Sequence, residues 1–118
     1  MLLKAKVAYL YWVTLHKNFP KVERLSLGQK IEHSFLDVLE VTYLSTYLQP
    51  DQKVIGLGKA ISKLDVAKFF MQIAWENKLI PLDKYADISG KLGEVGRMLG
   101  GWRKGVIEKL NKTPPPRK

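Results

Sequence analysis

The sequence predicts an all-α protein, an up-down-up-down antiparallel four-helix bundle. Apolar residues recur every three or four positions over four segments, and prolines separate these segments. No segment alternates apolar and polar residues for long enough to form a strand. The length of 118 residues suits a single domain. We expect the bundle to occupy residues 1–110, and residues 111–118 to form a disordered, basic, proline-rich tail.

The first helix is predicted over residues 2–18, ending before Pro20, because proline cannot continue a helix. The second is predicted from Ser26 to about Leu48. Ser26 and Gln29 have the spacing of a capping box, in which the hydroxyl and the amide satisfy free backbone N–H groups.

The third helix is predicted over residues 59–78, and its start is left open because Gly56 and Gly58 interrupt the preceding segment. The fourth helix is the most regular. Its apolar seam is spaced alternately by three and four residues, as in antiparallel bundles. The seam consists of Tyr85, Ile88, Leu92, Val95, Leu99, Trp102 and Val106.

Glycines interrupt the fourth helix. Gly90, Gly93 and Gly96 each cost about 1 kcal/mol relative to alanine in a helix interior, so we expect a neighbouring backbone to approach closely beside them. Gly100-Gly101 is expected to mark a helix end or a kink.

The second and third helices carry apolar residues outside their main stripes. Two explanations stay open: a small bundle that buries wide stripes, or a subunit interface rich in aromatic residues. The residues are Leu36, Leu39, Val41, Tyr43, Leu44, Val66, Phe69, Phe70, Ile73 and Trp75.

The formal net charge is +9, and nearly all of the excess lies at the two ends of the chain. Such a charge favours polyanionic partners. The chain has no cysteine, so it has no disulfide and no cysteine nucleophile. No apolar run approaches the roughly 20 residues of a membrane-spanning helix. We expect a cytoplasmic protein without a membrane partner.

No pattern of catalytic residues is present. Gly56-Leu57-Gly58-Lys59 lacks the first glycine and the Ser or Thr of a phosphate-binding loop. His33 and Asp37 share a helix face that Glu40 continues, and a solvated polar face is the simplest interpretation. We predict no enzyme activity, no metal site and no cofactor.

Basic residues are predicted to gather at the two ends of the bundle. Because the first and last helices are antiparallel, Lys4 and Lys6 are expected near Arg103 and Lys104, and Lys109 could extend this cluster. A second cluster is expected at the opposite end, formed by Lys17, Lys21 and Arg24. Contacts of such clusters with phosphates would be salt-dependent and would read little sequence.

Two motif blocks resemble a known family. They are Phe19-Pro20-Lys21 with Leu25-Ser26-Leu27-Gly28-Gln29-Lys30-Ile31-Glu32, and Leu92-Gly93-Glu94-Val95-Gly96-Arg97-Met98-Leu99-Gly100-Gly101-Trp102. Over about residues 3–104 the chain resembles the accessory variability determinant proteins of diversity-generating retroelements. That family belongs to a four-helix-bundle group that includes proteins encoded in ribosomal RNA intervening sequences.

The resemblance implies a non-enzymatic, barrel-like homopentamer that binds RNA and DNA with little sequence preference. It also implies association with the retroelement's reverse transcriptase during mutagenic copying of a template repeat. Carried onto this sequence, the residues expected at phosphates are Lys21, Arg24, Lys30, Arg97 and Arg103. The glycine-punctuated region 49–59 departs from the family pattern.

Two alternatives stay open. The chain could instead be a bundle protein of the ribosomal RNA intervening-sequence type. It could also be a structural oligomeric scaffold whose positive charge serves solubility or an acidic protein partner.

Overall fold

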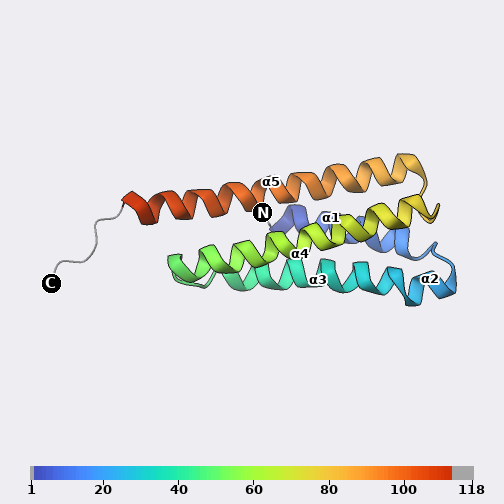
Figure 1. Ribbon diagram of the computed structural model, residues 1–118, viewed down its shortest axis with the longest axis horizontal. Helices are drawn as coiled ribbons and strands as arrows, with labels where there is room; N and C mark the ends of the chain where they lie inside the picture. The colour runs from blue at the N-terminus through green and yellow to red at the C-terminus, as the bar shows by residue number, and fades with distance from the viewer. Residues whose placement is uncertain (1, 113–118) are drawn as a thin grey trace.

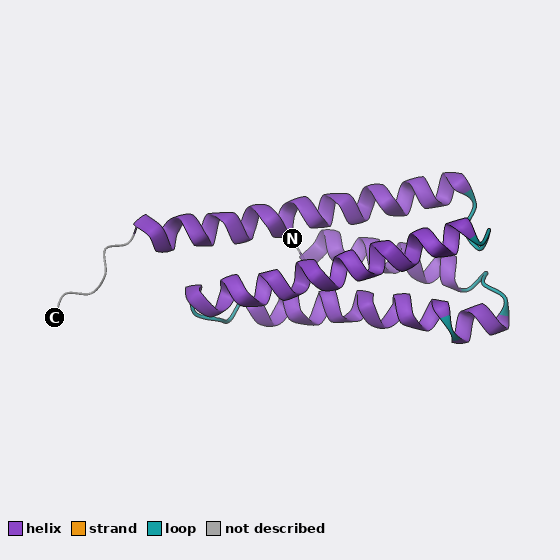
Figure 2. Cartoon of the chain, viewed as in Figure 1, coloured by secondary structure: helices purple, strands orange, loops and turns teal. Residues whose placement is uncertain are grey.

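Five helices follow one another along the chain: α1 (Leu2–His16), α2 (Lys21–Leu25), α3 (Leu27–Ser45), α4 (Pro50–Glu76) and α5 (Leu82–Lys112). The structure, a computed structural model, describes residues 2–112. Over that range there is no strand (Figure 2), and the predicted all-α class is confirmed. Helix α5 includes the first two residues of the expected tail, and residues 113–118 lie outside the described part of the chain.

The four long helices α1, α3, α4 and α5 run alternately in opposite directions (Figure 1). Helix α3 packs on α4 and α4 packs on α5, while α1 packs on both α5 and α3. The short α2 packs on α3 at the corner that joins α1 to α3. The up-down-up-down four-helix bundle that the sequence predicts is therefore confirmed.

Helix α1 is much shorter than the helix beside it. It has 15 residues and α5 has 31, which at about 1.5 Å per residue corresponds to roughly 22 and 46 Å. The start of α1 accordingly lies beside the middle of α5 (Figure 1). From there toward the C-terminal end of α5, the bundle is formed by α3, α4 and α5 alone among the described residues. We call this three-helix part, formed by residues 44–58 and 102–112, the open end.

The core follows this difference in length. On α5 the predicted seam is buried from Ile88 to Leu99, whereas Trp102 and Val106 at the open end are half-buried. At the four-helix end Trp12 is completely buried, and its ring packs edge-on against Phe19 at a centroid distance of 5.5 Å. Burial of such aromatic rings is a main source of stability in a small bundle.

The corner before α3 differs from the prediction. Residues 21–25 form the unpredicted helix α2, and α3 follows it after the single residue Ser26. The predicted capping box is wrong, because the Ser26 hydroxyl donates to the carbonyl of Val22 at 2.8 Å instead of capping α3. The hydroxyl therefore satisfies a carbonyl at the end of α2.

Helix α4 begins at Pro50, nine residues before the predicted segment. Proline is tolerated there because the first helical residue needs no N–H donor. Gly56 lies inside the helix and is buried against α3, where a Cβ would approach the Ser45 hydroxyl closer than 3.0 Å. The packing of α3 on α4 thus accounts for a glycine that suggested a loop in the sequence.

The glycines of α5 are explained only in part. A Cβ at Gly96 would meet Lys68 Nζ at 3.1 Å and Leu64 Cδ2 at 3.3 Å, so the close neighbours are side chains of α4 and not its backbone. At Gly90 a Cβ would meet nothing within 4 Å. The helix continues through Gly100-Gly101, so the predicted helix end is wrong. The apolar seam on both sides of these glycines still packs on α4, which offsets their low helix propensity.

Candidate nucleic-acid interface

The predicted cluster of Lys17, Lys21 and Arg24 forms at the corner between α1 and α2. All three side chains are exposed. Lys30 follows on the first turns of α3 and is also exposed, with its Nζ 5.8 Å from the centre of the Phe70 ring. The structure therefore brings four of the predicted basic residues to the four-helix end of the bundle. We call these four residues the corner cluster.

A buried aromatic and glycine framework holds this corner. Phe19 is 3% exposed and anchors the turn between α1 and α2 in the core. The His16 ring stacks on Trp12 at 4.9 Å, and its Nε2 donates to the carbonyl of Arg24 at 3.1 Å. A Cβ at Gly28 would collide with this ring, so glycine is what lets α3 pass beneath His16. The corner cluster thus stands on a rigid base.

A carboxylate links α3 to α1 beneath the corner. Glu32 accepts hydrogen bonds from the Tyr9 hydroxyl at 2.5 Å and from Trp12 Nε1 at 2.8 Å. Burial, the hydrogen bond to Glu32 and the charge of Glu32 raise the pKa of Tyr9 to about 12. This carboxylate therefore ties α3 to α1 directly beneath the corner cluster.

Three further predicted residues lie on α5. Arg97 and Lys104 are exposed and, seven residues apart, lie on the same outward face of the helix. Arg103 is half-buried, and its Nε donates to the carbonyl of Val54 on α4 at 3.1 Å. Arg103 therefore also ties α5 to the first turns of α4.

The predicted grouping of Lys4 and Lys6 with Arg103 and Lys104 is wrong. Lys4 Nζ pairs with Glu94 at 3.2 Å, nine residues and about 13 Å of helix before Arg103. Lys6 lies on the other side of α1, where it lines a hollow with Asp37 and Glu40 of α3. The physical reason is the shortness of α1, whose first residues lie beside the middle of α5 and do not reach the level of Arg103.

Lys53, which was not among the predicted residues, occupies an inward position of α4 at the open end. It precedes the buried positions Leu57, Ala60 and Leu64 at intervals of four, three and four residues. Its Nζ lies 5.9 Å from the centre of the Trp102 ring. The spacing would have identified Lys53 as inward-facing if the third helix had been extended back to Pro50.

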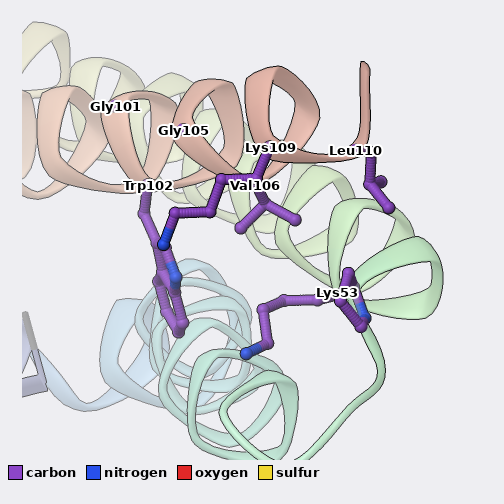
Figure 3. Close-up of a pocket in the computed structure, with 8 residues that line it drawn as sticks. Lys53, Gly101, Trp102, Gly105, Val106, Lys109 and Leu110 are labelled. Carbon is purple, nitrogen blue, oxygen red and sulfur yellow. The ribbon is translucent and has the colours of Figure 1, made fainter. Parts of the chain in front are cut away.

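Trp102 and Lys53 border a cavity of about 370 Å³ at the open end. Figure 3 shows the Lys53 and Lys109 side chains extending toward the Trp102 ring from α4 and α5. The cavity is lined by Pro50, Lys53, Gly101, Trp102, Gly105, Val106, Lys109 and Leu110. It combines apolar walls with two amines, and no acidic side chain from residues 2–112 lines it.

Residues 2–112 contain neither a metal-binding cluster nor a membrane-spanning helix. No group of three or more His, Asp or Glu side chains in that range is placed to hold a metal ion. Asp37, on the polar face noted in the sequence, pairs with Lys63 at 3.5 Å, and His33 is exposed. No helix in the described range is long and apolar enough to cross a membrane.

Comparison with known proteins gives one match. A family model described as bAvd-like matches residues 3–106, which is most of the chain. No curated protein matches it. The matched range includes α1 to α4, the corner cluster and α5 as far as Val106.

Proposed function

The chain belongs to the bAvd-like family of accessory variability determinant proteins, and from this premise we propose that it binds RNA and DNA through its basic surfaces. We propose further that it acts beside the reverse transcriptase of a diversity-generating retroelement and supports mutagenic copying of a template repeat. The protein's own contribution is to hold nucleic acid, and the polymerase performs the chemistry.

The observation that carries this proposal is the set of exposed basic side chains without acidic partners. Among the predicted site residues, only Lys4 forms an ion pair in the described part of the chain. The corner cluster and the outward face of α5 therefore present cations to solvent. Lysine and arginine in this state bind phosphates by releasing condensed counterions, and such binding needs no contact with base edges.

We also propose that the protein assembles into a homo-oligomer, with five copies as the expected number. The support is an apolar stripe on the outward face of α1, where Leu3, Val7 and Leu10 are 71%, 46% and 62% exposed. Apart from Lys4 and Lys6, helix α1 is mostly apolar, which is typical of a helix that is covered on more than one side. Leu36, Tyr43, Leu44, Val66 and Phe69 are likewise exposed outside the main seams, in keeping with a subunit interface.

Oligomerisation would strengthen nucleic-acid binding. Each chain carries a formal charge of +9, and a ring of five would gather five such charges into one field. Several weak phosphate contacts on linked subunits also act at high effective concentration, so their combined affinity exceeds that of one subunit.

Salt dependence of binding tests the nucleic-acid proposal. Fluorescence anisotropy with labelled duplex DNA should give an affinity that falls linearly on a log-log plot against salt, with a slope of about −0.9 for each phosphate contacted. Lys21→Gln and Lys104→Gln should each reduce the slope by roughly one contact. Lys63→Gln is the matched control, because Lys63 already pairs with Asp37. The proposal is refuted if the protein binds neither RNA nor DNA at low ionic strength.

Association with the polymerase needs a separate test. Co-expression with the reverse transcriptase of a diversity-generating retroelement should yield a complex that stays together on size-exclusion chromatography after nuclease treatment. The family match favours this role over the ribosomal RNA intervening-sequence alternative. A coding sequence located inside a ribosomal RNA gene, with no reverse transcriptase nearby, would contradict it.

A further inference from the structure

We propose that the cavity beside Trp102 at the open end is a stacking site for one base of a single-stranded nucleic acid. This inference rests on the proposed nucleic-acid binding and adds a ligand class to one place on the surface. It predicts that an unpaired base of a single strand can stack on Trp102. The bases of a duplex cannot do so, because they are already stacked on one another.

The position of Trp102 is the first argument. Trp102 continues the apolar seam of α5, but α1 does not reach this level, so the ring is half-buried and lines a cavity. A tryptophan packed by a fourth helix would be enclosed as Trp12 is. Aromatic rings that remain accessible in a basic groove are the usual platforms for unpaired bases.

The walls beside the ring leave room for a planar ligand. Gly101 and Gly105 lie on the same side of α5, and a Cβ at either position would meet nothing within 4 Å. The cavity volume of about 370 Å³ lies within the usual range for small-molecule sites. The two glycines therefore leave this side of α5 open, and Lys109 is the charged side chain of α5 that extends toward the ring.

The lysines beside the ring favour an anionic ligand, and the ring itself favours a ligand that carries aromatic groups. Lys53 and Lys109 extend toward the ring from two helices (Figure 3). No carboxylate within the described residues pairs with Lys53, which is held only over the face of Trp102. From Arg97 to Lys112, α5 carries five basic residues and only Glu108 as an acid. A nucleotide segment matches this arrangement, with its base against the indole and its phosphates near the Lys53 amine.

The decisive experiment compares two ligands with equal charge. An oligodeoxyadenosine strand of about 12 nucleotides and its abasic counterpart carry the same phosphates, and only the first has bases to stack. Affinities are measured by anisotropy at the same salt concentration. The wild-type protein should bind the base-bearing strand at least about fivefold more tightly than the abasic strand, as expected for a single stacked base.

Two variants remove this preference by different routes. Trp102→Leu removes the ring and keeps an apolar side chain in the seam. Gly105→Leu keeps the ring and fills the cavity, and it should not destabilise the fold because the site is open. Both should bring the two affinities together and leave duplex binding unchanged. Trp75→Leu is the control, since Trp75 stacks on Tyr85 at the four-helix end.

The outcomes separate this inference from the proposed function. If the wild-type protein binds nucleic acid but both variants keep the preference for the base-bearing strand, the stacking site is refuted and general binding stands. If both variants weaken duplex and single-strand binding equally, the stacking site is also refuted. If the wild-type protein binds no nucleic acid, the proposed function fails, and the stacking site fails with it.

Discussion

The close approach of Gly56 to Ser45 gives a prediction about stability. Gly56→Ala should lower the free energy of unfolding of the wild-type protein and raise that of the Ser45→Ala variant. Gly56 lies inside α4, and a Cβ there would approach the Ser45 hydroxyl closer than 3.0 Å. Ser45 is 1% exposed, and its hydroxyl donates to the carbonyl of Val41 at 2.7 Å, so it has little freedom to move. Gly56→Ala should therefore force α3 and α4 apart.

The expected magnitude follows from two opposing effects. Alanine gains about 1 kcal/mol over glycine in a helix interior. Overpacking of a tight contact costs about 2–3 kcal/mol when a hydroxyl or a helix has to move. We therefore expect Gly56→Ala to lower the free energy of unfolding by about 1–2 kcal/mol.

Ser45→Ala changes this balance. Without the hydroxyl, the nearest atoms to a new Cβ at position 56 are Cβ of residue 45 at 3.5 Å, an ordinary contact, and Leu48 Cδ1 at 3.2 Å, the end of a flexible side chain. In the Ser45→Ala background, Gly56→Ala should raise the free energy of unfolding by about 0.5–1 kcal/mol. The coupling between the two sites is then about 2 kcal/mol, well above the error of a double-mutant cycle.

The assay is urea denaturation followed by circular dichroism for the four proteins of the cycle. Protein concentration is held constant because oligomerisation would shift the apparent stability. The reasoning is refuted if Gly56→Ala has the same effect, within about 0.5 kcal/mol, in both backgrounds. Such additivity would mean that α3 and α4 do not approach each other at this point.

Two further predictions concern stability. Gly90→Ala should raise the free energy of unfolding by about 0.5–1 kcal/mol, because a Cβ there meets nothing within 4 Å; an unchanged or lower melting temperature would show that this glycine has a packing role. The raised pKa of Tyr9, about 12 against an ordinary value of 10.0, means that the folded state favours the protonated phenol. The stabilisation that the protonated Tyr9 phenol gives to the folded state is complete below pH 10 and is lost as the pH rises toward 12. The wild-type protein should therefore lose more free energy of unfolding than Tyr9→Phe between these two pH values. Parallel melting curves for the two proteins over that range would contradict this.

The four long helices and their buried faces were readable from the sequence, but the short α2 was not. The seam of α5 from Ile88 to Leu99 and the stripe that includes Ile31, Phe35 and Val38 are buried as their spacing predicts. The start of α4 was not readable, because Gly56 looks like a loop residue until Ser45 of α3 is known to press against it. Local propensity was outweighed there by packing between helices that are adjacent in space.

The candidate site was predicted unevenly for a related reason. Lys17, Lys21 and Arg24 are close in sequence, so local structure alone places them together. The expected grouping of Lys4 with Arg103 depended on the relative lengths and offset of α1 and α5, which no single segment encodes. Lys53 was missed because its inward position is visible only when α4 is extended to Pro50.

The shortness of α1 also has a consequence for how the molecule opens. Over its last three turns α5 is supported by the start of α4 and has no fourth helix beside it, so few buried contacts oppose local unfolding there. Backbone amides after Trp102 should exchange with solvent hydrogen far faster than those from Ile88 to Leu99, which sit in the completed core. Helix α5 therefore combines a slowly exchanging part, from Ile88 to Leu99, with a rapidly exchanging part after Trp102. A ligand bound to the second part would slow the exchange of the backbone amides there.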